Sequence, residues 1–239
     1  KKLNLKNNCK SLKVNIKNLR QIQKIFSKEK PDFVFHLAAQ SLVKKSYSNP
    51  INTFETNTLG TLNVLESLKK LKNRCNVVII TSDKSYKNIE KKNGYDENDV
   101  IGGHDPYSAS KGAAEIIIQS YLKSYFSNNE SKIKIAVARA GNVIGGGDWS
   151  SDRLIPDCVK SWSNYKSVVV RNPNSTRPWQ HVLEALGGYL ILATKLHIKK
   201  FHGEAFNFGP TLQNQRTVMS LIKDIRKFWP GIKWKIKKK

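Results

Sequence analysis

The chain has 239 residues, of which 39% are hydrophobic, so it can bury the core of one domain or of a main domain with a smaller lobe. No apolar run approaches the roughly 20 residues of a membrane helix, and the N-terminal residues lack the apolar stretch of a signal peptide. These features exclude a membrane-spanning class and predict a cytoplasmic protein. Cys9, Cys75 and Cys158 stand singly, so we expect neither a disulfide framework nor a metal site.

The formal net charge is +24, with 42 Lys and Arg against 18 Asp and Glu. A nucleic-acid interface usually gathers arginines and aromatic residues in a stripe or tail, whereas the lysines here are spread over nearly every segment, often beside asparagine. The composition therefore predicts lysine-rich solvated faces that attract anionic small molecules. We expect no nucleic-acid and no membrane partner.

Hydrophobic periodicity predicts alternating strands and helices in the first half of the chain. Residues 14–16 have the pattern of a short strand end, and residues 18–30 place apolar side chains on one face of a helix. The apolar run 32–39 is typical of a buried strand. A helix is expected over 50–71 with Pro50 at its start, and the next buried strand over 76–82.

The second half continues the alternation. Asp105 is placed to cap, and Pro106 to start, a long helix that ends near residue 126. Further strands are predicted at 132–140, 167–170 and 204–209. This alternation is typical of parallel βαβ units, so we predict an α/β fold with a doubly wound, Rossmann-like parallel sheet that binds ligands at the carboxyl ends of its strands. The Gly-rich stretch 141–149 interrupts the pattern and marks the start of a smaller lobe.

Tyr107 and Lys111 lie four residues apart at the start of the long helix and therefore on one face of it. A Tyr-x-x-x-Lys pair carries little information in a chain with so many lysines. Its context is more informative, because the pair follows a Gly-Gly loop and comes after the strand that ends at Thr81-Ser82-Asp83. We therefore take the pair as a candidate catalytic unit.

These segments resemble, in order and spacing, the extended short-chain dehydrogenases that dehydrate sugar nucleotides. The resemblance covers residues 15–210 and rests on PDFVFHLAAQSLVKKSYSNPINTFETNTLGTLNVLE, TSDKSY, GGHDPYSASKGAAE, ARAGNVIGGGDW, DRLIPD, TRPWQHVLEALGGYLILA and FNFGP. Ser82-Asp83-Lys84 is the discriminating piece, because members that act on dTDP-glucose or GDP-mannose carry Glu at the third position. With Lys84 there, the chain is most similar to the members that act on CDP-glucose.

The resemblance implies an NAD-dependent lyase that takes hydride from C4 of the glucosyl unit of CDP-glucose, eliminates water across C5 and C6, and returns the hydride to C6. Tyr107 would be the base for the 4-hydroxyl, with its pKa lowered from about 10 by the positive charges of Lys111 and the nicotinamide. Ser82 would bind the 4-oxygen, and Asp83 would protonate the departing 6-hydroxyl. Lys84 would be the base at C5; the alternative is a solvated lysine, with Asp83 or a water as the base.

The resemblance also assigns binding residues. NAD would be held by Asn15, Ile16, Leu37, Ala38, Ala39, Gln40, Asn57, Thr81, Tyr107, Lys111 and Val143. The sugar nucleotide would be held by Ser82, Asn142, Arg153, Arg177 and Asn207. Asn15 stands where relatives usually have an Asp that contacts adenine, and Arg177 matches the Arg that binds the diphosphate, a task that suits the guanidinium fork.

Gly141, Gly145 and Gly147 have the spacing of a dinucleotide loop and follow an apolar strand. The polar segment after them contains Pro156 where a phosphate-binding helix needs apolar residues, so we interpret this stretch as the substrate loop of the family. The family's own Gly-rich strand, loop and helix would precede the first residue. We therefore expect a fragment that lacks the N-terminal βαβ phosphate-loop unit and the closing elements of the substrate lobe.

Two domains are expected from the resemblance. They are an NAD-binding domain of residues 1–146 and 176–208, and a substrate-binding lobe of residues 147–175 and 209–239. The helices at 50–70 and 105–126 resemble those that pair in homodimers of the family, so we expect a homodimer or a higher homo-oligomer.

Two alternatives stay open. A related sugar-nucleotide epimerase or reductase would keep Tyr107 and Lys111 but does not need an acid and a base at Asp83 and Lys84. A catalytically inactive binding protein would be consistent with the missing Gly-rich loop and the high charge. Product analysis separates the first alternative from a dehydratase, and a measured NAD affinity tests the second.

Overall fold

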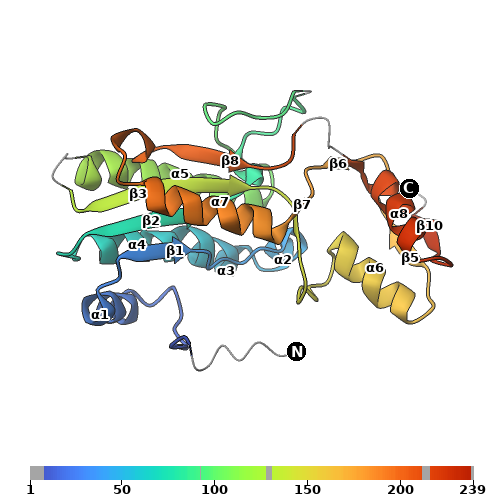
Figure 1. The fold of residues 1–239 in the computed structure, drawn as a ribbon, viewed down its shortest axis with the longest axis horizontal. Coiled ribbons are helices and arrows are strands. Elements are labelled where there is room, and N and C mark those ends of the chain that lie inside the picture. Colours follow the sequence, from blue (N-terminus) through green and yellow to red (C-terminus); the bar gives the residue numbers. More distant parts are fainter. Residues whose placement is uncertain (1–7, 92, 128–130, 212–215, 238–239) are drawn as a thin grey trace.

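The computed structural model describes residues 8–91, 93–127, 131–211 and 216–237. Its centre is a four-stranded sheet in the order β1-β2-β3-β8 (Figure 1). The strands are β1 (Phe33–His36), β2 (Cys75–Ile80), β3 (Ile133–Ala140) and β8 (Ala205–Phe208). Every neighbouring pair runs parallel, so the predicted parallel sheet is confirmed.

Helices cover both faces of this sheet, as in a doubly wound fold (Figure 1). On one face, α4 (Gly60–Leu68) and α5 (Pro106–Tyr121) pack over the strands, and α1 (Leu19–Glu29) packs against α4. On the other face lies α7 (Val182–Lys195), whose buried side chains form a second cluster with β2 and β3.

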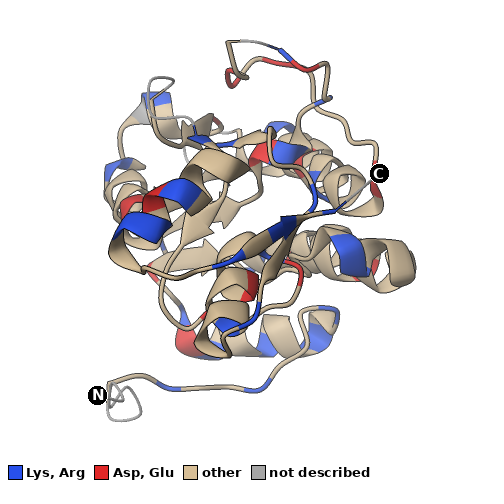
Figure 2. Ribbon diagram, turned by 90° about the vertical axis from the view of Figure 1, so that its right-hand side faces the viewer, with Lys and Arg blue, Asp and Glu red and all other residues tan. Residues whose placement is uncertain are grey.

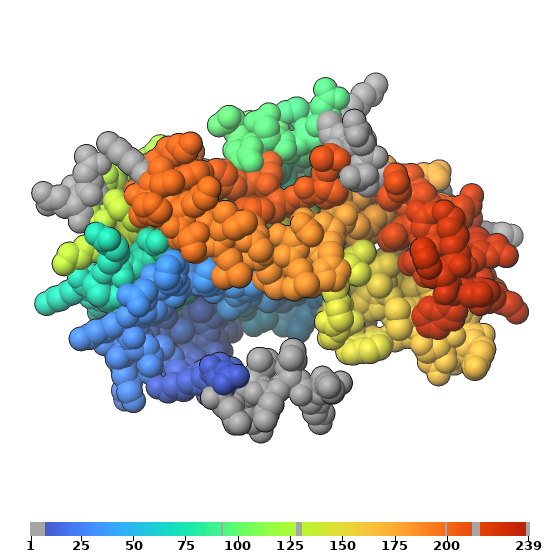
Figure 3. Space-filling view, in the orientation of Figure 1, coloured from blue at the N-terminus to red at the C-terminus, as the bar shows by residue number. Residues whose placement is uncertain are grey.

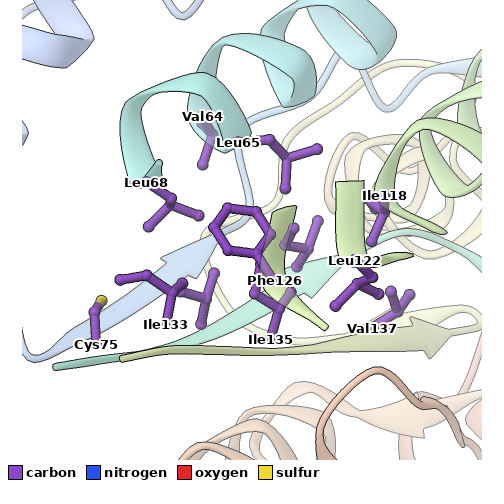
Figure 4. Packing of buried hydrophobic residues seen from close by; sticks show 12 residues of the cluster. Val64, Leu65, Leu68, Cys75, Ile118, Leu122, Phe126, Ile133, Ile135 and Val137 are labelled. Atoms are coloured by element: carbon purple, nitrogen blue, oxygen red, sulfur yellow. The ribbon is translucent and has the colours of Figure 1, made fainter. Parts of the chain in front are cut away.

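The core under α4 and α5 is mainly aliphatic, with the ring of Phe126 packed among the aliphatic side chains (Figure 4). Leu65 and Ile118 from the helices and Ile79 and Ile135 from the strands are at most 1% exposed. Burial of each such side chain stabilises the fold by about 1.5–3 kcal/mol before conformational entropy is counted. This packing fixes the strands, so the loops at their carboxyl ends start from a rigid base.

The helical stretch predicted from Pro50 is present but is not uniform. It consists of α3 (Pro50–Phe54), a π-helical turn η2 (Glu55–Leu59) and then α4. The Asn49 side chain caps its first turn. The sequence pattern gives no sign of the π turn, which carries the buried Asn57.

The predicted start of α5 is confirmed. The Asp105 carboxylate accepts hydrogen bonds from the backbone N–H groups of Tyr107 and Ser108, both at 3.0 Å. Gly103 passes so close to this first turn that a Cβ there would lie 2.3 Å from the backbone nitrogen of Ala109. Only glycine leaves room at this point, so the Gly-Gly loop helps to fix where Tyr107 stands.

A smaller lobe lies at one end of the main sheet, at the right of Figure 1 and, in yellow and red, of Figure 3. Its elements are α6 (Leu154–Ser163), β5 (Val168–Val170), β6 (Thr176–Arg177), β9 (Arg216–Thr217), α8 (Val218–Phe228) and β10 (Trp234–Ile236). The lobe has its own buried cluster, formed by Cys158, Trp162, Val168, Val170, Ile222 and Ile232. The strand predicted at 167–170 belongs here, where it pairs with β10. The domain boundaries given above remain predictions.

Residues 14–16 do not form the predicted strand. The Asn15 side chain accepts a hydrogen bond from the backbone N–H of Lys17 at 3.0 Å, and its carbonyl accepts from Asn18 at 2.9 Å. Asn18 then caps the first turn of α1. Asparagine thus offers the backbone a turn that competes with strand formation. β1 is also less buried than predicted, with Phe33 48% exposed, because β1 is the outer strand of the described sheet.

Among the described residues, no helix is long and apolar enough to cross a membrane. Lys and Arg are spread over several helices and loops (Figure 2). Ion pairs at the surface, such as that of Lys17 with Glu55 at 2.8 Å, contribute little to stability because both partners are solvated.

Candidate active site

The segments that follow the parallel strands meet at one edge of the sheet. Residues 37–40 follow β1, residues 81–84 follow β2 and residues 141–143 follow β3. The start of α5 lies at the same edge, since Nζ of Lys111 donates to the carbonyl oxygen of Ile80, the last residue of β2, at 3.2 Å. The residues predicted to be catalytic, which follow β2 or lie on α5, are thereby brought together.

Tyr107 and Lys111 occupy the first two turns of α5 and are buried, with 8% and 6% of their surface exposed. The backbone N–H of Tyr107 also donates to Oγ of Ser46, 3.1 Å away in α2 (Val43–Ser48). The Tyr107 hydroxyl lies close enough to the Ser82 side chain, just after β2, for Ser82 to lower the pKa of the phenol. The phenol oxygen is therefore held beside the serine that the sequence pairs with it.

The pKa of the Tyr107 phenol is set by burial in the chain by itself. Burial raises this pKa above its ordinary value, and Ser82 offsets only part of the rise. The Lys111 ammonium is directed at the carbonyl of Ile80, and the lowering of the Tyr107 pKa by Lys111 and the nicotinamide remains a prediction. Burial also lowers the pKa of Lys111 to about 8, although the charge of Glu115 acts in the opposite direction.

Replacing Lys111 with Met is expected to stabilise the chain at neutral pH. A fall of the Lys111 pKa from 10.5 to about 8 means that the buried charge costs about 3 kcal/mol at pH values below 8. Above about pH 8 the folded state loses this proton while the unfolded state still binds it, so the cost shrinks as the pH rises. We expect urea unfolding to show Lys111→Met about 2 kcal/mol more stable than the parent at pH 7, and the difference to be about 1 kcal/mol smaller at pH 9.

Lys123 provides the matched control, because it lies exposed just beyond α5. Lys123→Met should leave the free energy of unfolding unchanged to within about 0.5 kcal/mol at both pH values. Unchanged or lower stability of Lys111→Met at pH 7 would contradict a buried, charged Lys111.

Asp83 begins the 3₁₀ turn η3 (Asp83–Ser85) and lies against two other segments. Its Oδ1 accepts a hydrogen bond from Oγ of Ser82 at 3.1 Å. Gly141 approaches so closely that a Cβ there would lie 3.2 Å from Asp83 Oδ2 and 2.6 Å from the Pro178 ring. The loops after β2, β3 and β6 therefore converge on this carboxyl group.

Burial raises the pKa of Asp83, while Lys84, the Ser82 hydrogen bond and Arg177 act against the rise. A carboxyl group that holds its proton more firmly than usual is suited to donate it as a general acid. The position and the environment of Asp83 are thus those of an acid that could protonate a leaving hydroxyl.

Lys84 follows directly and is half-buried. Its backbone N–H donates to Oγ of Ser82 at 3.2 Å, which fixes the turn. The Lys84 ammonium makes no hydrogen bond and no ion pair with any described residue. This geometry is compatible with both hypotheses for Lys84, a base at C5 and a solvated lysine.

The two predicted substrate arginines face the same place. Arg177 lies near enough for its charge to lower the pKa of Asp83. Arg153 donates from Nη2 to Oγ of Ser41 at 3.0 Å, and its charge lowers the pKa of Tyr107. The smaller lobe thus presents two guanidinium groups to the carboxyl edge of the main sheet.

The other predicted substrate ligands are less distinctive. Asn142 is exposed, and Val143 lies in the short strand β4 (Val143–Ile144). Asn207 is exposed at β8, but its amide is already engaged, since Oδ1 accepts from Oη of Tyr86 at 2.7 Å and Nδ2 donates to the carbonyl of Tyr95 at 3.0 Å. Any contact of Asn207 with a substrate would have to share these atoms.

The residues predicted to hold the cofactor fall into two groups. Leu37 and Ala38 are exposed and Ala39 is half-buried at the end of β1, where a ligand can reach them. Gln40 and Asn57 are buried and bonded to each other, with Gln40 N donating to Asn57 Oδ1 at 2.8 Å and Asn57 Nδ2 donating to Gln40 O at 3.0 Å. This second group braces the loop after β1 against the π turn.

Asn15 and Ile16 lie before α1. The Ile16 side chain packs against the core under α4, and its carbonyl accepts from Asn63 at 3.0 Å. No contact among the described residues joins Asn15 or Ile16 to Tyr107 or Lys111, so their assignment to the cofactor remains a prediction.

The glycines at 141, 145 and 147 do not precede a helix. Gly147 has a φ of +87°, and the next helix, α6, begins only at Leu154. A dinucleotide phosphate is bound by the free N–H groups of a helix N-terminus, which this loop does not place next to the glycines. The geometry agrees with the interpretation of the stretch as something other than a dinucleotide loop.

Sequence reasoning missed a buried pair, Glu115 and Arg139, that lies beside the site. Nε of Arg139 donates to Oε1 of Glu115 at 2.8 Å, and Oγ1 of Thr81 donates to the same oxygen at 2.6 Å. The signals were present in the sequence. Glu115 lies one helical turn beyond Lys111 on the face of α5 that meets the sheet, and Arg139 interrupts the apolar end of a strand.

The hydrogen-bond donors of Lys111 fit the nicotinamide ribose of the predicted cofactor. An ammonium has three N–H donors, and among the described residues Lys111 uses one of them, toward the Ile80 carbonyl. The remaining donors suit ribose hydroxyls. Leu37, 50% exposed at the end of β1, adds an apolar surface at the same edge of the sheet.

The parallel α/β sheet, with Tyr107 and Lys111 beside Ser82 at its carboxyl edge, places the chain in the Rossmann-like short-chain dehydrogenase class. The chain belongs to the GDP-mannose 4,6-dehydratase family, whose sequence profile matches residues 1–225. Over 219 residues it is 46% identical to CDP-glucose 4,6-dehydratase of Salmonella typhimurium, a match that covers 90% of this chain and 61% of that enzyme. The chain thus spans about three fifths of the length of this relative. The predicted family is confirmed.

Two further likenesses show the breadth of the family. CDP-paratose 2-epimerase of Salmonella typhi is 28% identical over 233 residues, which are 87% of this chain and 66% of that enzyme. The solved structure of dTDP-glucose 4,6-dehydratase from Streptomyces venezuelae, with NAD bound, matches with a TM-score of 0.77 at 20% identity and covers 94% of this chain and 66% of that one. At that identity the structural likeness shows the fold.

Proposed function

We propose that this chain carries the active site of a CDP-glucose 4,6-dehydratase, which forms CDP-4-dehydro-6-deoxyglucose and water. The observation that carries the proposal is the position of Ser82-Asp83-Lys84, the Ser-Asp-Lys triplet, beside Tyr107 and Lys111 at the carboxyl edge of the sheet. The 46% identity to an enzyme of that name supports the choice of substrate.

The first step is oxidation at C4. NAD, when bound, would supply the hydride acceptor for C4 and the hydride donor for C6. Tyr107 takes the proton of the 4-hydroxyl while Ser82 donates a hydrogen bond to the same oxygen. Lys111 binds the ribose hydroxyls with the protons that it does not donate to Ile80. Because burial raises the pKa of Tyr107, the phenol stays neutral in the free chain.

The second step is the loss of water. A ketone at C4 makes the C5 proton acidic, so Lys84 can remove this proton, and a proton returns to C5 when C6 receives the hydride. Asp83, whose pKa is raised by burial, protonates the 6-hydroxyl as it departs. One turn after β2 thus supplies the acid and the base to adjacent carbons of the sugar.

The diphosphate and the sugar are held from the smaller lobe. Arg177 and Arg153 face the site, and a guanidinium group contacts two phosphate oxygens at once. Asn142, in the loop after β3, contacts the sugar diphosphate. Leu37 and Val143, which follow β1 and β3, would supply the apolar surface that holds the nicotinamide.

The active form is a homodimer that pairs the helical stretches 50–70 and 105–126 of two chains. Ile51 and Ile116, which lie in these stretches, are 73% and 61% exposed. Apolar side chains at this exposure favour burial against a second copy.

A nucleotide-sugar epimerase is the second candidate, since the chain is also 28% identical to CDP-paratose 2-epimerase. Such an enzyme uses Tyr107 and Lys111 for hydride transfer but does not require a proton donor for a leaving hydroxyl at Asp83. The raised pKa of Asp83 therefore favours the dehydratase.

The test uses the completed chain, defined as this chain joined at both ends to the segments of the Salmonella typhimurium relative that lie outside the matched region. We expect it to convert CDP-glucose at least about tenfold more efficiently than dTDP-glucose or GDP-mannose, because one well-placed contact contributes that much discrimination. The products are identified by NMR as 4-keto-6-deoxy sugars.

A second completed chain carries the corresponding segments of the Streptomyces venezuelae dTDP-glucose 4,6-dehydratase. If both completed chains prefer CDP-glucose, the residues of this chain determine the preference, because the added segments differ between the two. Equal or faster turnover of either competitor would refute the substrate, and a product that keeps its 6-hydroxyl would favour the epimerase.

A further inference from the structure

A two-point ion pair between Glu115 and Arg139 is buried behind the Ser-Asp-Lys triplet. Nε and Nη2 of Arg139 lie 2.8 Å and 2.5 Å from the two carboxylate oxygens of Glu115. The two side chains are 1% and 2% exposed, whereas in every other ion pair between described residues both side chains are at least 23% exposed. The pair is therefore unlike the solvated pairs of the surface.

Glu115 holds the triplet at both of its ends. Its Oε1 accepts hydrogen bonds from Oγ1 of Thr81 at 2.6 Å and from Oγ of Ser85 at 3.0 Å. Thr81 and Ser85 are the residues directly before and after the triplet. Oγ of Ser85 also lies 2.6 Å from the carbonyl of Ser82, which closes the turn. One carboxylate oxygen thus fixes the segment that carries the proposed acid and base.

Arg139 extends this network to the loop after the triplet. Its Nη1 donates to Oη of Tyr86 at 2.7 Å and to the carbonyl of Glu97 at 3.0 Å. Tyr86 in turn donates to Asn207 at the end of β8. The ends of three strands and the middle of α5 are therefore tied together around one guanidinium group.

Stability alone does not account for two charges at this depth. Replacing a buried ion pair with apolar residues of similar size is often neutral or stabilising, whereas removing one partner is strongly destabilising. We propose that Glu115 and Arg139 are positioning residues that hold Ser82, Asp83 and Lys84 in their catalytic geometry. This inference rests on the proposed dehydratase function, and neither side chain is required to touch the substrate.

The first test replaces both charges in the completed chain, with Glu115→Leu and Arg139→Met together. We expect kcat for CDP-glucose to fall about a hundredfold, because a displacement of about 1 Å in a catalytic group has an effect of that size. KM should change by less than about threefold and the unfolding midpoint by less than about 5 °C, since the paired replacement leaves no buried charge.

The matched control replaces the exposed pair with Asp224→Leu and Lys227→Met and should leave kcat unchanged. A kcat within about threefold of the parent in the buried double variant would overturn the proposal.

The second variant, Glu115→Gln, separates positioning from stability. Its amide oxygen still accepts from Thr81 and Ser85, so kcat should stay within about tenfold of the parent. Arg139 then keeps an uncompensated charge, so the unfolding midpoint should fall by roughly 10 °C. Glu115→Gln is therefore expected to be less stable but more active than the double variant with Glu115→Leu and Arg139→Met. A hundredfold loss of kcat in this variant too would contradict the role given to the acceptor oxygen.

A measurement without substrate keeps this inference distinct from the proposed function. In the 239-residue chain, the amides of Lys84 and Ser85 donate to Ser82, and we expect them to exchange with deuterium about tenfold faster in the double apolar variant. Peptides from β2 and α5 should keep the exchange rates of the parent, and Glu115→Gln should leave the triplet protected. Unchanged exchange at the triplet would reject the positioning role even if the enzyme is active. A completed chain that is inactive on all three nucleotide sugars would reject the proposed function alone.

Discussion

Replacing Tyr107 with Phe is expected to lower kcat of the completed chain for CDP-glucose by about a thousandfold, the range typical of a lost general base. The substitution removes one oxygen from a side chain that is 8% exposed and leaves the ring in place. The backbone N–H of Tyr107 keeps its hydrogen bonds to Asp105 and Ser46, so the start of α5 stays intact. NAD affinity, measured by calorimetry, should be unchanged to within about threefold, since Lys111 is untouched.

Tyr189→Phe is the matched control for this prediction. Tyr189 is 5% exposed in α7, and burial raises its pKa to about 12, but it lies in the cluster on the other face of the sheet. Its variant should keep the kcat of the parent. Activity retained by Tyr107→Phe would mean that the Tyr-x-x-x-Lys spacing occurs here by chance.

Replacing Lys84 with Met is expected to stop the reaction after its first half. Hydride transfer from C4 needs Tyr107, Lys111 and NAD, so it should proceed, whereas the loss of the base at C5 should lower deoxysugar formation by about a hundredfold. Reduced cofactor should then accumulate when CDP-glucose is added, visible as its near-ultraviolet absorbance. In deuterium oxide, exchange of the hydrogen at C5 should be lost together with product formation.

The comparison for Lys84 is Lys87→Met, which removes an exposed lysine three residues further along the same loop. It should show neither trapped reduced cofactor nor slower exchange. If Lys84→Met still exchanges C5 hydrogen at the parent rate, another group is the base. A modest loss of rate that depends on salt concentration, without trapped cofactor, would mean that Lys84 only balances charge.

The fold was largely predictable because its signals are local. The cap at Asp105, the apolar runs of β2 and β3 and the stripe of α1 each fix one element, and their alternation fixes a parallel sheet. The strand expected at 14–16 was wrong because the short-range hydrogen bonds of Asn15 outweigh the apolar pattern of its neighbours.

The site was predictable to a smaller extent, since its chemistry depends on contacts between distant segments. The positions of Tyr107 and Lys111 follow from helical spacing, but their pKa values follow from burial, which the sequence pattern does not give. Glu115 and Arg139 lie 24 positions apart, and their pairing becomes visible only when α5 lies on β3. The hydrogen bond between Tyr86 and Asn207 joins residues 121 positions apart and was likewise invisible in the sequence.

The most direct measurement of the proposed reaction follows a single hydrogen. CDP-glucose with deuterium at C4 of the glucosyl unit is incubated with the completed chain and NAD, and the position of the deuterium in the product is determined by NMR. The dehydratase account predicts that deuterium leaves C4 and appears at C6 of the 4-keto-6-deoxy sugar, because the same hydride is removed and returned. Deuterium that returns to C4 of a sugar with an intact 6-hydroxyl would contradict the account and identify an epimerase.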